Sequence, residues 1–466
     1  MFKKNNYLIF LCVLLGGLKL ISVSTTGFSL YGDEAQYWLW SKDLDFGYYS
    51  KPPLLSWTIW LFTSVFGDSF FALKSIPVFL YFFTSFLIYF FTQKLFNDRS
   101  LAVACSITFF LLPAASLSSF LLSTDSLLIF FWILSLIQVL QIKQNPNYTN
   151  FVILGILVGL TILTKYAGIY FIISIFLLFI IEKNYRLVFI KSKNKIFVSI
   201  ICLFVVLLPN IIWNFQNDWL TLDHTAKNAS LNTIRLNFAG LSNFIISQVI
   251  MIGPILFVGF VFYFFKTKKI TNEEKFLISF ALPALIIVLI ESFLVRAHAN
   301  WAAVSLVTLT IFFVGVLYKY NKMVFYISSY FNFLIGVALF VMIATTSSFS
   351  FFDRISGMKD FVSFLETKNS KKIENIVVVD RLLFASLKYE NRYKKTIFYT
   401  PHEPGRDIVH HFQLKNSLPA NFLKNFILIG EKKEVSYLKN KHTIKLIDSK
   451  LFKFSKTELK IYEVSF

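Results

Sequence analysis

Long hydrophobic runs, separated by short polar connections, fill the first three quarters of the chain. A membrane core about 30 Å thick needs roughly 20 apolar residues of helix to cross it, so runs of about this length predict membrane spans. The runs define about eleven spans, near residues 7–23, 71–93, 100–117, 126–142, 151–164, 167–181, 196–212, 241–265, 276–294, 301–318 and 323–345. The pattern predicts a polytopic, all-α membrane domain over residues 1–345.

The run 151–181 decides how many times the chain crosses the membrane, because Lys165 and Tyr166 interrupt it. It forms either two short spans joined by an outer turn or one tilted helix of about 30 residues. A single helix would bury the Lys165 ammonium at a cost of a few kcal/mol. We therefore expect a break at Lys165, an odd number of spans, and chain ends on opposite sides of the membrane.

The pattern changes after residue 345, where short amphipathic and β-rich segments alternate. We expect helices at 358–367, 381–389 and 434–439, and strands at 375–379 and 426–429. Residues 346–466 also hold 22 of the 46 Lys and Arg but only 13 of the 26 Asp and Glu. The sequence thus predicts a small, basic, soluble α/β domain at the C-terminal end.

Composition and charge narrow the function classes. Of 466 residues, 56% are hydrophobic and only 15% are charged, which is too apolar for one soluble domain. The net charge is +20, but basic residues beside spans commonly set orientation rather than bind nucleic acid. With the N-terminus in the cytoplasm, sixteen Lys and Arg fall in cytoplasmic connections and seven in the opposite ones. This bias predicts an extracytoplasmic C-terminal domain and no nucleic-acid partner, while the three cysteines, all inside apolar runs, predict no disulfide or zinc site.

The first external loop holds the most informative polar residues. Residues 33–41 have helical composition, and helical spacing puts Asp33, Gln36, Tyr37 and Trp40 on one face. A helix that mixes a carboxylate with aromatic surface suits the membrane interface. The structural alternative is that Asp33 caps the helix, with Gln36 completing a capping box.

Lys51 lies further along the same loop, before Pro52 and Pro53. The two prolines stiffen the backbone and hold this ammonium near the bilayer surface, where it suits a lipid phosphate. A lysine that only extends its side chain to the interface is the alternative. The nearby Asp43-Leu44-Asp45 resembles a metal-binding D-x-D pattern, but two acids at this spacing usually form a solvated surface.

Later external connections supply further charged candidates. Asp125 interrupts an apolar hairpin, and an ionisable group at membrane depth is a functional hypothesis by default, with helix capping as the rival. Arg296 and His298 lie at the outer end of a span and could bind a phosphate or a carboxylate. An ion pair between Arg296 and Glu291 is the alternative. Amides and indoles at 210–219 suit either a sugar site or an interfacial anchor.

Several short motifs occur in one order: Asp33-Glu34-Ala35-Gln36-Tyr37, Tyr48-Tyr49-Ser50-Lys51-Pro52-Pro53, Ser123-Thr124-Asp125, Leu163-Thr164-Lys165-Tyr166, Trp213-Asn214 and His298-Ala299-Asn300-Trp301. In this order they make the chain resemble glycosyltransferase family 39, over about residues 1–345. That family belongs to the GT-C membrane glycosyltransferases and includes protein mannosyltransferases and bacterial lipid A aminoarabinose transferases. The resemblance implies a GT-C-type helical bundle with an external active site.

The resemblance also implies roles for residues of this chain. Asp33 resembles the catalytic acidic residue of the family's first loop, and Lys51 matches the lysine that holds the donor phosphate. The expected substrate-binding residues are Glu34, Lys51, Asp125, Lys165, Arg296 and His298. Ser50 stands where the lipid A branch carries an acidic residue implicated in metal binding, so we expect no metal and no cofactor.

The implied enzyme transfers a sugar, with inversion, from a polyprenyl-phosphate donor to an extracytoplasmic acceptor. The expected acceptor is lipid A or another envelope glycolipid, and the expected location is the bacterial inner membrane with the site and the C-terminal domain in the periplasm. Membrane lipids are the other expected partners. A protein O-mannosyltransferase-like enzyme is the alternative, and a flippase for lipids or polyprenol sugars is less favoured because no paired or inverted halves occur.

Overall fold

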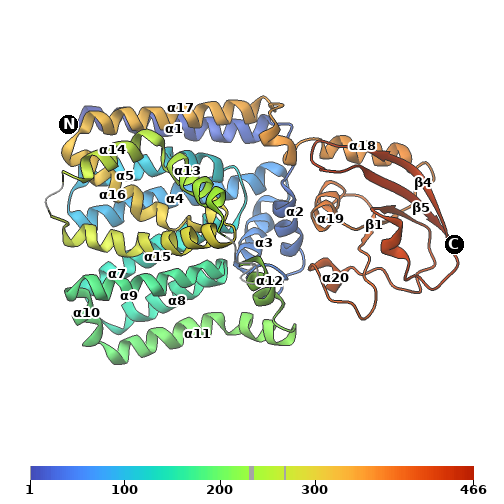
Figure 1. The fold of residues 1–466 in the computed structure, drawn as a ribbon, viewed down its shortest axis with the longest axis horizontal. Coiled ribbons are helices and arrows are strands. Elements are labelled where there is room, and N and C mark those ends of the chain that lie inside the picture. The colour runs from blue at the N-terminus through green and yellow to red at the C-terminus, as the bar shows by residue number, and fades with distance from the viewer. Residues whose placement is uncertain (1, 230–235, 267–268) are drawn as a thin grey trace.

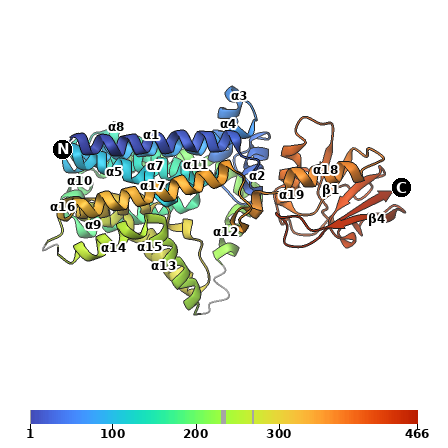
Figure 2. The same cartoon turned by 90° about the horizontal axis from the view of Figure 1, so that it is seen from above.

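The computed structural model describes residues 2–229, 236–266 and 269–466. Two parts lie along its long axis, a bundle of apolar helices and a small sheet domain at the C-terminal end (Figure 1). Seen from above, the sheet domain continues the long axis of the bundle beyond α2 (Figure 2). Two cations of the orientation count, Arg235 and Lys268, lie outside the described residues.

The membrane domain consists of helices that follow the predicted apolar runs. Their bounds are α1 Phe2–Thr25, α2 Gly32–Ser41, α3 Leu54–Phe66, α4 Phe70–Phe96, α5 Arg99–Leu111, α6 Pro113–Ser118, α7 Thr124–Gln144, α8 Tyr148–Thr164, α9 Tyr170–Ile181, α10 Lys183–Ile190, α11 Lys193–Gln216, α12 Leu220–Ala229, α13 Phe238–Ile252, α14 Pro254–Phe264, α15 Asn272–Leu294, α16 Ser305–Tyr320 and α17 Lys322–Ala344. Each predicted span falls on one of these helices or on two consecutive ones.

Length and hydropathy separate these helices into groups. Five of the described helices, α4, α7, α11, α15 and α17, are long and apolar enough to cross a membrane by themselves. The predicted span 241–265 is wrong in shape, because Gly253 and Pro254 divide it into α13 and α14, which meet at 98°. Residues Tyr166–Ile181 and α10 form a second bent pair, at 111°. The remaining apolar helices are shorter, which fits a bundle whose outer ends are irregular.

The predicted break at Lys165 is present. Helix α8 ends at Thr164, a 3-10 turn covers Tyr166–Ile169, and α9 then starts at Tyr170. With this break, the connections 26–69, 165–169 and 295–304 and the C-terminal domain lie at the same end of the bundle, opposite the N-terminus (Figure 1). The candidate residues of the external loops can therefore meet.

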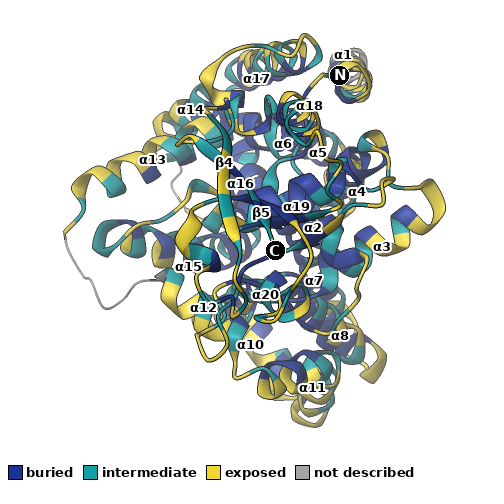
Figure 3. Cartoon of the chain, turned by 90° about the vertical axis from the view of Figure 1, so that its right-hand side faces the viewer, coloured by how far each residue is buried: buried dark blue, intermediate teal, exposed yellow. Residues whose placement is uncertain are grey.

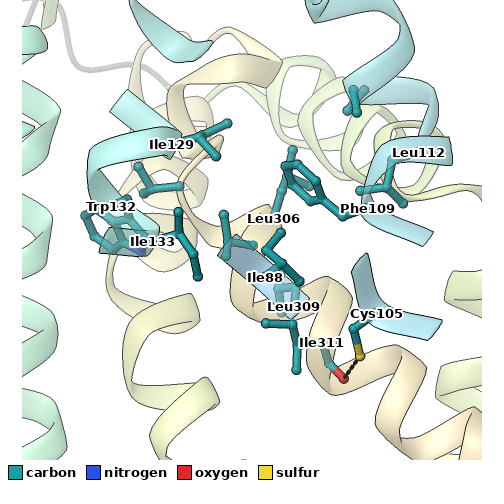
Figure 4. Packing of buried hydrophobic residues seen from close by; sticks show 14 of the residues in the cluster. Ile88, Cys105, Phe109, Leu112, Ile129, Trp132, Ile133, Leu306, Leu309 and Ile311 are labelled. Carbon is teal, nitrogen blue, oxygen red and sulfur yellow. Dashed lines mark hydrogen bonds between the residues drawn. The ribbon is translucent and has the colours of Figure 1, made fainter. Parts of the chain in front are cut away.

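The bundle core is built from interlocking aliphatic and aromatic side chains. Figure 4 shows part of this core, where Ile88, Phe109, Trp132 and Leu306 come from four different helices and are all buried. Gly155 on α8 permits a close helix crossing, because a Cβ there would lie 2.1 Å from the Ser199 carbonyl oxygen on α11. The periphery is apolar and exposed, as on α3, α11 and α13 (Figure 3), which suits contact with lipid.

The C-terminal domain is an α/β unit with one five-stranded sheet of order β2-β1-β3-β5-β4. Its elements are α18 Met358–Lys368, β1 Asn375–Val378, α19 Arg381–Glu390, β2 Ile397–Tyr399, α20 Phe412–Lys415, β3 Phe426–Ile429, β4 Thr443–Lys450 and β5 Leu459–Ser465. Strand β1 pairs in parallel with β2 and β3, and β5 pairs antiparallel with β3 and β4. The predicted helix at 434–439 is wrong, since this segment holds only the end of a 3-10 turn over Lys432–Val435.

The two parts share one hydrophobic core. Trp38 and Trp40 of α2 belong to the same buried cluster as Phe384 of α19 and Ile427 of β3. Helices α2 and α19 pack side by side, and a Cβ on Gly32 would lie 2.6 Å from the Leu382 Cβ. The C-terminal domain is thus fastened directly to the first external loop.

Candidate active site

Helix α2 places Asp33 at the junction of the two parts (Figure 1). The helix begins two residues earlier than capping by Asp33 requires. Tyr31 is the N-cap, and its backbone N–H donates to the Glu34 carboxylate at 2.7 Å. The capping alternative for Asp33 is therefore wrong, and within the described chain no hydrogen bond or ion pair engages the Asp33 carboxylate.

Glu34 has a different environment from Asp33, although it is the next residue. Its side chain is 1% exposed and accepts from Lys74 Nζ at 2.7 and 2.8 Å. The backbone N–H groups of Tyr31 and Leu122 complete the set, at 2.7 and 2.6 Å. Because a carboxylate offers about four lone-pair sites, no acceptor site is left for a substrate. These contacts tie α2 to α4 and favour a structural role for Glu34, while its role in substrate binding stays a prediction.

Three cations surround Asp33 without contacting it directly. Burial raises the pKa of the Asp33 carboxyl, while Arg381, Lys51 and Arg354 act in the opposite direction. Arg381 is the first residue of α19 and follows Asp380, which caps that helix. Arg354 donates to the hydroxyl of Tyr31 at 3.1 Å, and Tyr31 lies two residues before Asp33 in the sequence. A half-buried carboxyl with a raised pKa among cations can accept a proton near neutral pH.

Lys51, one of these cations, lies in a tight turn. The turn is closed by a hydrogen bond from the Tyr48 backbone N–H to the Lys51 carbonyl at 3.2 Å. Burial lowers the pKa of Lys51 to about 8, with Lys165 as the next cause and Asp125 and Asp33 opposing it. No carboxylate lies within 4.0 Å of its ammonium in the described residues. Lys51 also lines a cavity of 360 Å³ together with Lys165, His224 and Trp301.

Asp125 organises the floor of the same region. Its Oδ1 accepts from Lys165 Nζ at 2.7 Å, and its Oδ2 accepts from Asn300 Nδ2 at 2.5 Å. Asp125 is the second residue of α7, Lys165 joins α8 to the turn before α9, and Asn300 lies in the 3-10 turn Ala299–Ala302 before α16. This buried carboxylate therefore fixes three outer connections against one another, and it brings Lys165 to the cavity that Lys51 lines.

His298 and Arg296 are exposed at the rim. The His298 ring contacts Trp301 with centroids 5.4 Å apart, and burial together with Arg296 and Lys165 lowers the His298 pKa. Among the described residues no salt bridge joins Arg296 to Glu291, so the expected rival ion pair is not formed. The two residues remain available to a ligand that enters from the outer end.

The amides at the end of α11 hold the first loop in place. Asn210 donates to the Phe46 carbonyl at 2.7 Å and accepts from the Tyr166 hydroxyl at 3.0 Å. Trp213 packs beneath Gly47, where a Cβ would lie 2.4 Å from the indole. Asn210 and Trp213 thus support the Lys51 turn rather than forming a separate sugar site.

Sequence reasoning missed Arg381 and Arg354, which the C-terminal domain and its connection bring to Asp33. A signal for Arg381 was present, because it lies two residues after the apolar run 376–379. Residues at the carboxyl ends of parallel strands commonly form ligand sites in α/β sheets. The described residues contain no group of three or more His, Cys, Asp or Glu that could hold a metal.

Comparison with known sequences gives a consistent family. Residues 50–213 match the family described as dolichyl-phosphate-mannose-protein mannosyltransferase. The lipid A galacturonosyltransferase RgtD of Rhizobium johnstonii is 29% identical over 319 residues. That alignment covers 68% of this chain and 66% of the relative, so the chain spans just under two thirds of it.

Comparison with solved structures extends the likeness over the whole chain. ArnT from Cupriavidus metallidurans bound to undecaprenyl phosphate superposes with a TM-score of 0.67 at 12% identity, covering 98% of each chain. The apo structure of the same protein gives 0.65 at 11% identity. At these identities the likeness is one of fold. Sequence and fold together confirm the resemblance to glycosyltransferase family 39, and the fold is that of the GT-C membrane glycosyltransferases.

Proposed function

We propose that this chain is an inverting glycosyltransferase that moves a sugar from a polyprenyl-phosphate donor to an extracytoplasmic acceptor. The observation that carries the proposal is the placement of Asp33 and Lys51. A half-buried carboxyl with a raised pKa and a half-buried ammonium without a carboxylate partner share one end of the bundle. One is suited to accept a proton, and the other to bind a phosphate.

Lys51 takes the donor phosphate in this proposal. Polyprenyl phosphate leaves readily once its developing charge is offset, and an ammonium in a partly dry site does this better than an exposed one. Its pKa of about 8 keeps most of the lysine protonated at pH 7. Lys165 lines the same cavity and is already turned toward Asp125, so it provides a second positive charge beside the phosphate.

Asp33 acts on the acceptor. As a general base it removes the proton of the attacking hydroxyl, and one direct displacement inverts the anomeric carbon. Burial raises its pKa, which favours proton acceptance, and the charges of Arg381, Lys51 and Arg354 oppose that rise. Where the acceptor is a phosphate, which is already anionic, Arg296 and His298 at the rim serve to orient it.

The acceptor we propose is lipid A or another envelope glycolipid, following RgtD, whose name states lipid A as its substrate. The proposed location is the bacterial inner membrane, with the site and the C-terminal domain in the periplasm. The matched family description names a protein mannosyltransferase, which favours a protein acceptor as the second candidate. A flippase is less favoured, because it would need alternating access rather than a site at one end.

Sugar transfer by the purified full chain in detergent tests the proposal. We expect Asp33→Asn to lower turnover about 10²- to 10⁴-fold, the usual contribution of a general base, with donor affinity retained. The matched control is Asp218→Asn, since Asp218 is exposed at the same end and has φ 50°, which Asn also adopts. Near wild-type turnover of Asp33→Asn would refute the assignment.

Mass spectrometry of lipid A and of glycoproteins, from cells with and without the chain, identifies the acceptor. A hexose or uronic acid missing from lipid A in cells without the chain supports the glycolipid acceptor. A sugar missing only from glycoproteins supports the protein acceptor instead. Unchanged lipid A and glycoproteins, together with no transfer in vitro, would contradict both.

A further inference from the structure

A second cavity, of 530 Å³, lies between α2, the first external loop and the C-terminal domain. Its walls include Trp38 and Lys42 from the membrane domain and Lys388, Arg392 and Phe412 from the C-terminal domain. None of the residues that line the Lys51 cavity lines this one. The junction therefore holds a second cavity, to which the proposed reaction assigns no role.

The charge of this cavity is positive. Five cations line it, against the two acids Asp43 and Asp68. Three of the cations have carboxylate partners, in the pairs Lys42–Asp68, Lys415–Asp43 and Lys394–Glu366. The other two, Lys388 and Arg392, have no carboxylate within 4.0 Å in the described chain.

Lys388 and Arg392 are held in place although they lack counter-ions. Burial lowers the pKa of Lys388, and Asp43 partly opposes this. The Arg392 guanidinium stacks over Tyr389 at 4.1 Å and over Tyr393 at 4.7 Å, and it donates to the Tyr389 carbonyl at 2.8 Å. A desolvated ammonium beside a fixed guanidinium forms a strong anion site, because low local polarity strengthens charge–charge attraction.

The walls between these cations are aromatic. Trp38, Trp40 and Phe412 line the cavity, and His411 lies among them at 5% exposure. Burial lowers the His411 pKa to about 4, so the ring is neutral at pH 7, and its Nδ1 has no hydrogen-bond partner in the described chain. Aromatic faces combined with polar groups suit the apolar face and the hydroxyls of a sugar ring.

The position of the cavity relative to Asp33 follows from α2 and α19, which run side by side in the same direction. Gly32 meets Leu382 near their starts, and Trp38 meets Tyr389 near their ends, with ring centroids 5.0 Å apart. Asp33 and Trp40 are seven residues apart on α2, which is roughly 10 Å along a helix. Asp33 and the second cavity are therefore about one disaccharide apart.

The cavity also lies at the membrane surface. Asp68, which lines it, stands two residues before α4 begins its course through the bundle. The exposed side chains Leu61, Val65 and Phe66 of α3 precede it in the sequence and form an apolar surface that suits contact with lipid. A headgroup that projects from the bilayer can reach the cavity, which favours a membrane lipid over a free anion.

We propose that this second cavity binds the anionic saccharide headgroup of the acceptor glycolipid, with Lys388 and Arg392 on its phosphate or carboxylate. This inference rests on the proposed function and names the acceptor class as an anionic glycolipid. It assigns to the C-terminal domain the role of an acceptor-binding domain. The acceptor hydroxyl then lies at Asp33 while the anionic group is held roughly 10 Å away along α2.

Binding and transfer by the full chain, reconstituted in detergent-free lipid nanodiscs, test the proposal with Lys388→Gln. The probes are vesicles containing lipid A, vesicles of phosphatidylglycerol with the same surface charge, and inorganic phosphate. We expect Lys388→Gln to weaken binding of lipid A vesicles at least tenfold, and Lys388→Arg to restore most of it. The control Lys424→Gln removes an exposed cation of the same domain outside the cavity and should change nothing.

The kinetic readout separates this inference from the proposed function. Lys388→Gln should raise the acceptor KM while leaving kcat and the donor KM unchanged. Wild-type transfer with an unaltered acceptor KM in Lys388→Gln would overturn the subsite alone. Absence of transfer by the wild-type chain would overturn the proposed function. The vesicle assay would still measure whether the second cavity binds the headgroup. Equal binding of phosphatidylglycerol vesicles, or displacement by inorganic phosphate at the same concentration as lipid A, would also refute a saccharide site.

Discussion

Replacing Glu34 by glutamine tests whether this carboxylate is structural. The change removes the negative charge and leaves the Lys74 ammonium buried, at 0% exposure, with neutral oxygens as its only partners: the Phe120 carbonyl at 3.0 Å and the one oxygen that glutamine retains. Breaking a buried ion pair by removing one partner typically costs about 3–5 kcal/mol. Glutamine also replaces one acceptor oxygen with an NH₂ group, although two backbone N–H groups point at this site.

Thermal unfolding in detergent measures the loss, with donor binding measured on the same samples. The control is Glu431→Gln, the same chemical change at an exposed pair with Lys460, which should leave the midpoint unchanged. In the double variant Glu34→Gln with Lys74→Met, no buried ammonium is left unpaired. The remaining loss should then fall below about 2 kcal/mol, the cost of imperfect hydrogen bonds.

The opposite result would refute this reasoning. If Glu34→Gln unfolds at the wild-type temperature but binds donor poorly, then Glu34 is a substrate ligand and the sequence-based expectation was right. If Lys74→Met fails to rescue Glu34→Gln, the two residues do not act as a pair.

The remaining predictions concern pH, domain contact and topology. We expect kcat/KM to rise with pH as Asp33 loses its proton, at a pH above the ordinary carboxyl range, and to fall as Lys51 deprotonates near pH 8. The variant Lys51→Arg should abolish the decrease at high pH. A kcat/KM that does not change with pH would contradict both roles. Gly32→Ala should loosen the C-terminal domain, because the new Cβ meets α19 at 2.6 Å, and limited proteolysis between the two parts would show it; unchanged protection would argue against this contact. In a background without native cysteines, a membrane-impermeant thiol reagent should label a cysteine at the exposed Ser436 from outside but not one at the exposed Lys191, and the reverse would invert the topology.

The spans and the break at Lys165 could be predicted because a bilayer imposes a local rule on length and polarity. The break follows from the cost of burying the Lys165 ammonium. This cost can be read from the local sequence, without knowing which residues lie nearby in the fold. The bend at Gly253 was missed, although Gly-Pro is a recognisable breaker, because the hydrophobic run continues through it. Strand β4 was missed for another reason: its residues are mostly half-exposed and carry charges, so its strand pairing depends on β5.

The site was predictable where chemistry is concentrated in one loop. Asp33 and Lys51 stand out in the sequence by their neighbours, and their places in the structure make the proposed roles testable. The role of Glu34 could not be read in the same way, since Lys74 lies 40 residues further along the chain. Arg381 lies in a different domain from Asp33, and only the packing of α19 on α2 brings the two together.

The shared core between α2 and the C-terminal domain has a consequence for biosynthesis. The helix that carries Asp33 is made long before its partners: Tyr31 can bond to Arg354 only after 323 further residues have been made, and α2 can pack on α19 only later still. Strand β5, at 459–465, lies inside the sheet rather than at its edge, so the domain is complete only when nearly the whole chain has been made. A nascent chain can therefore insert every span and still hold an unfinished site, which prevents a half-made enzyme from consuming its lipid donor.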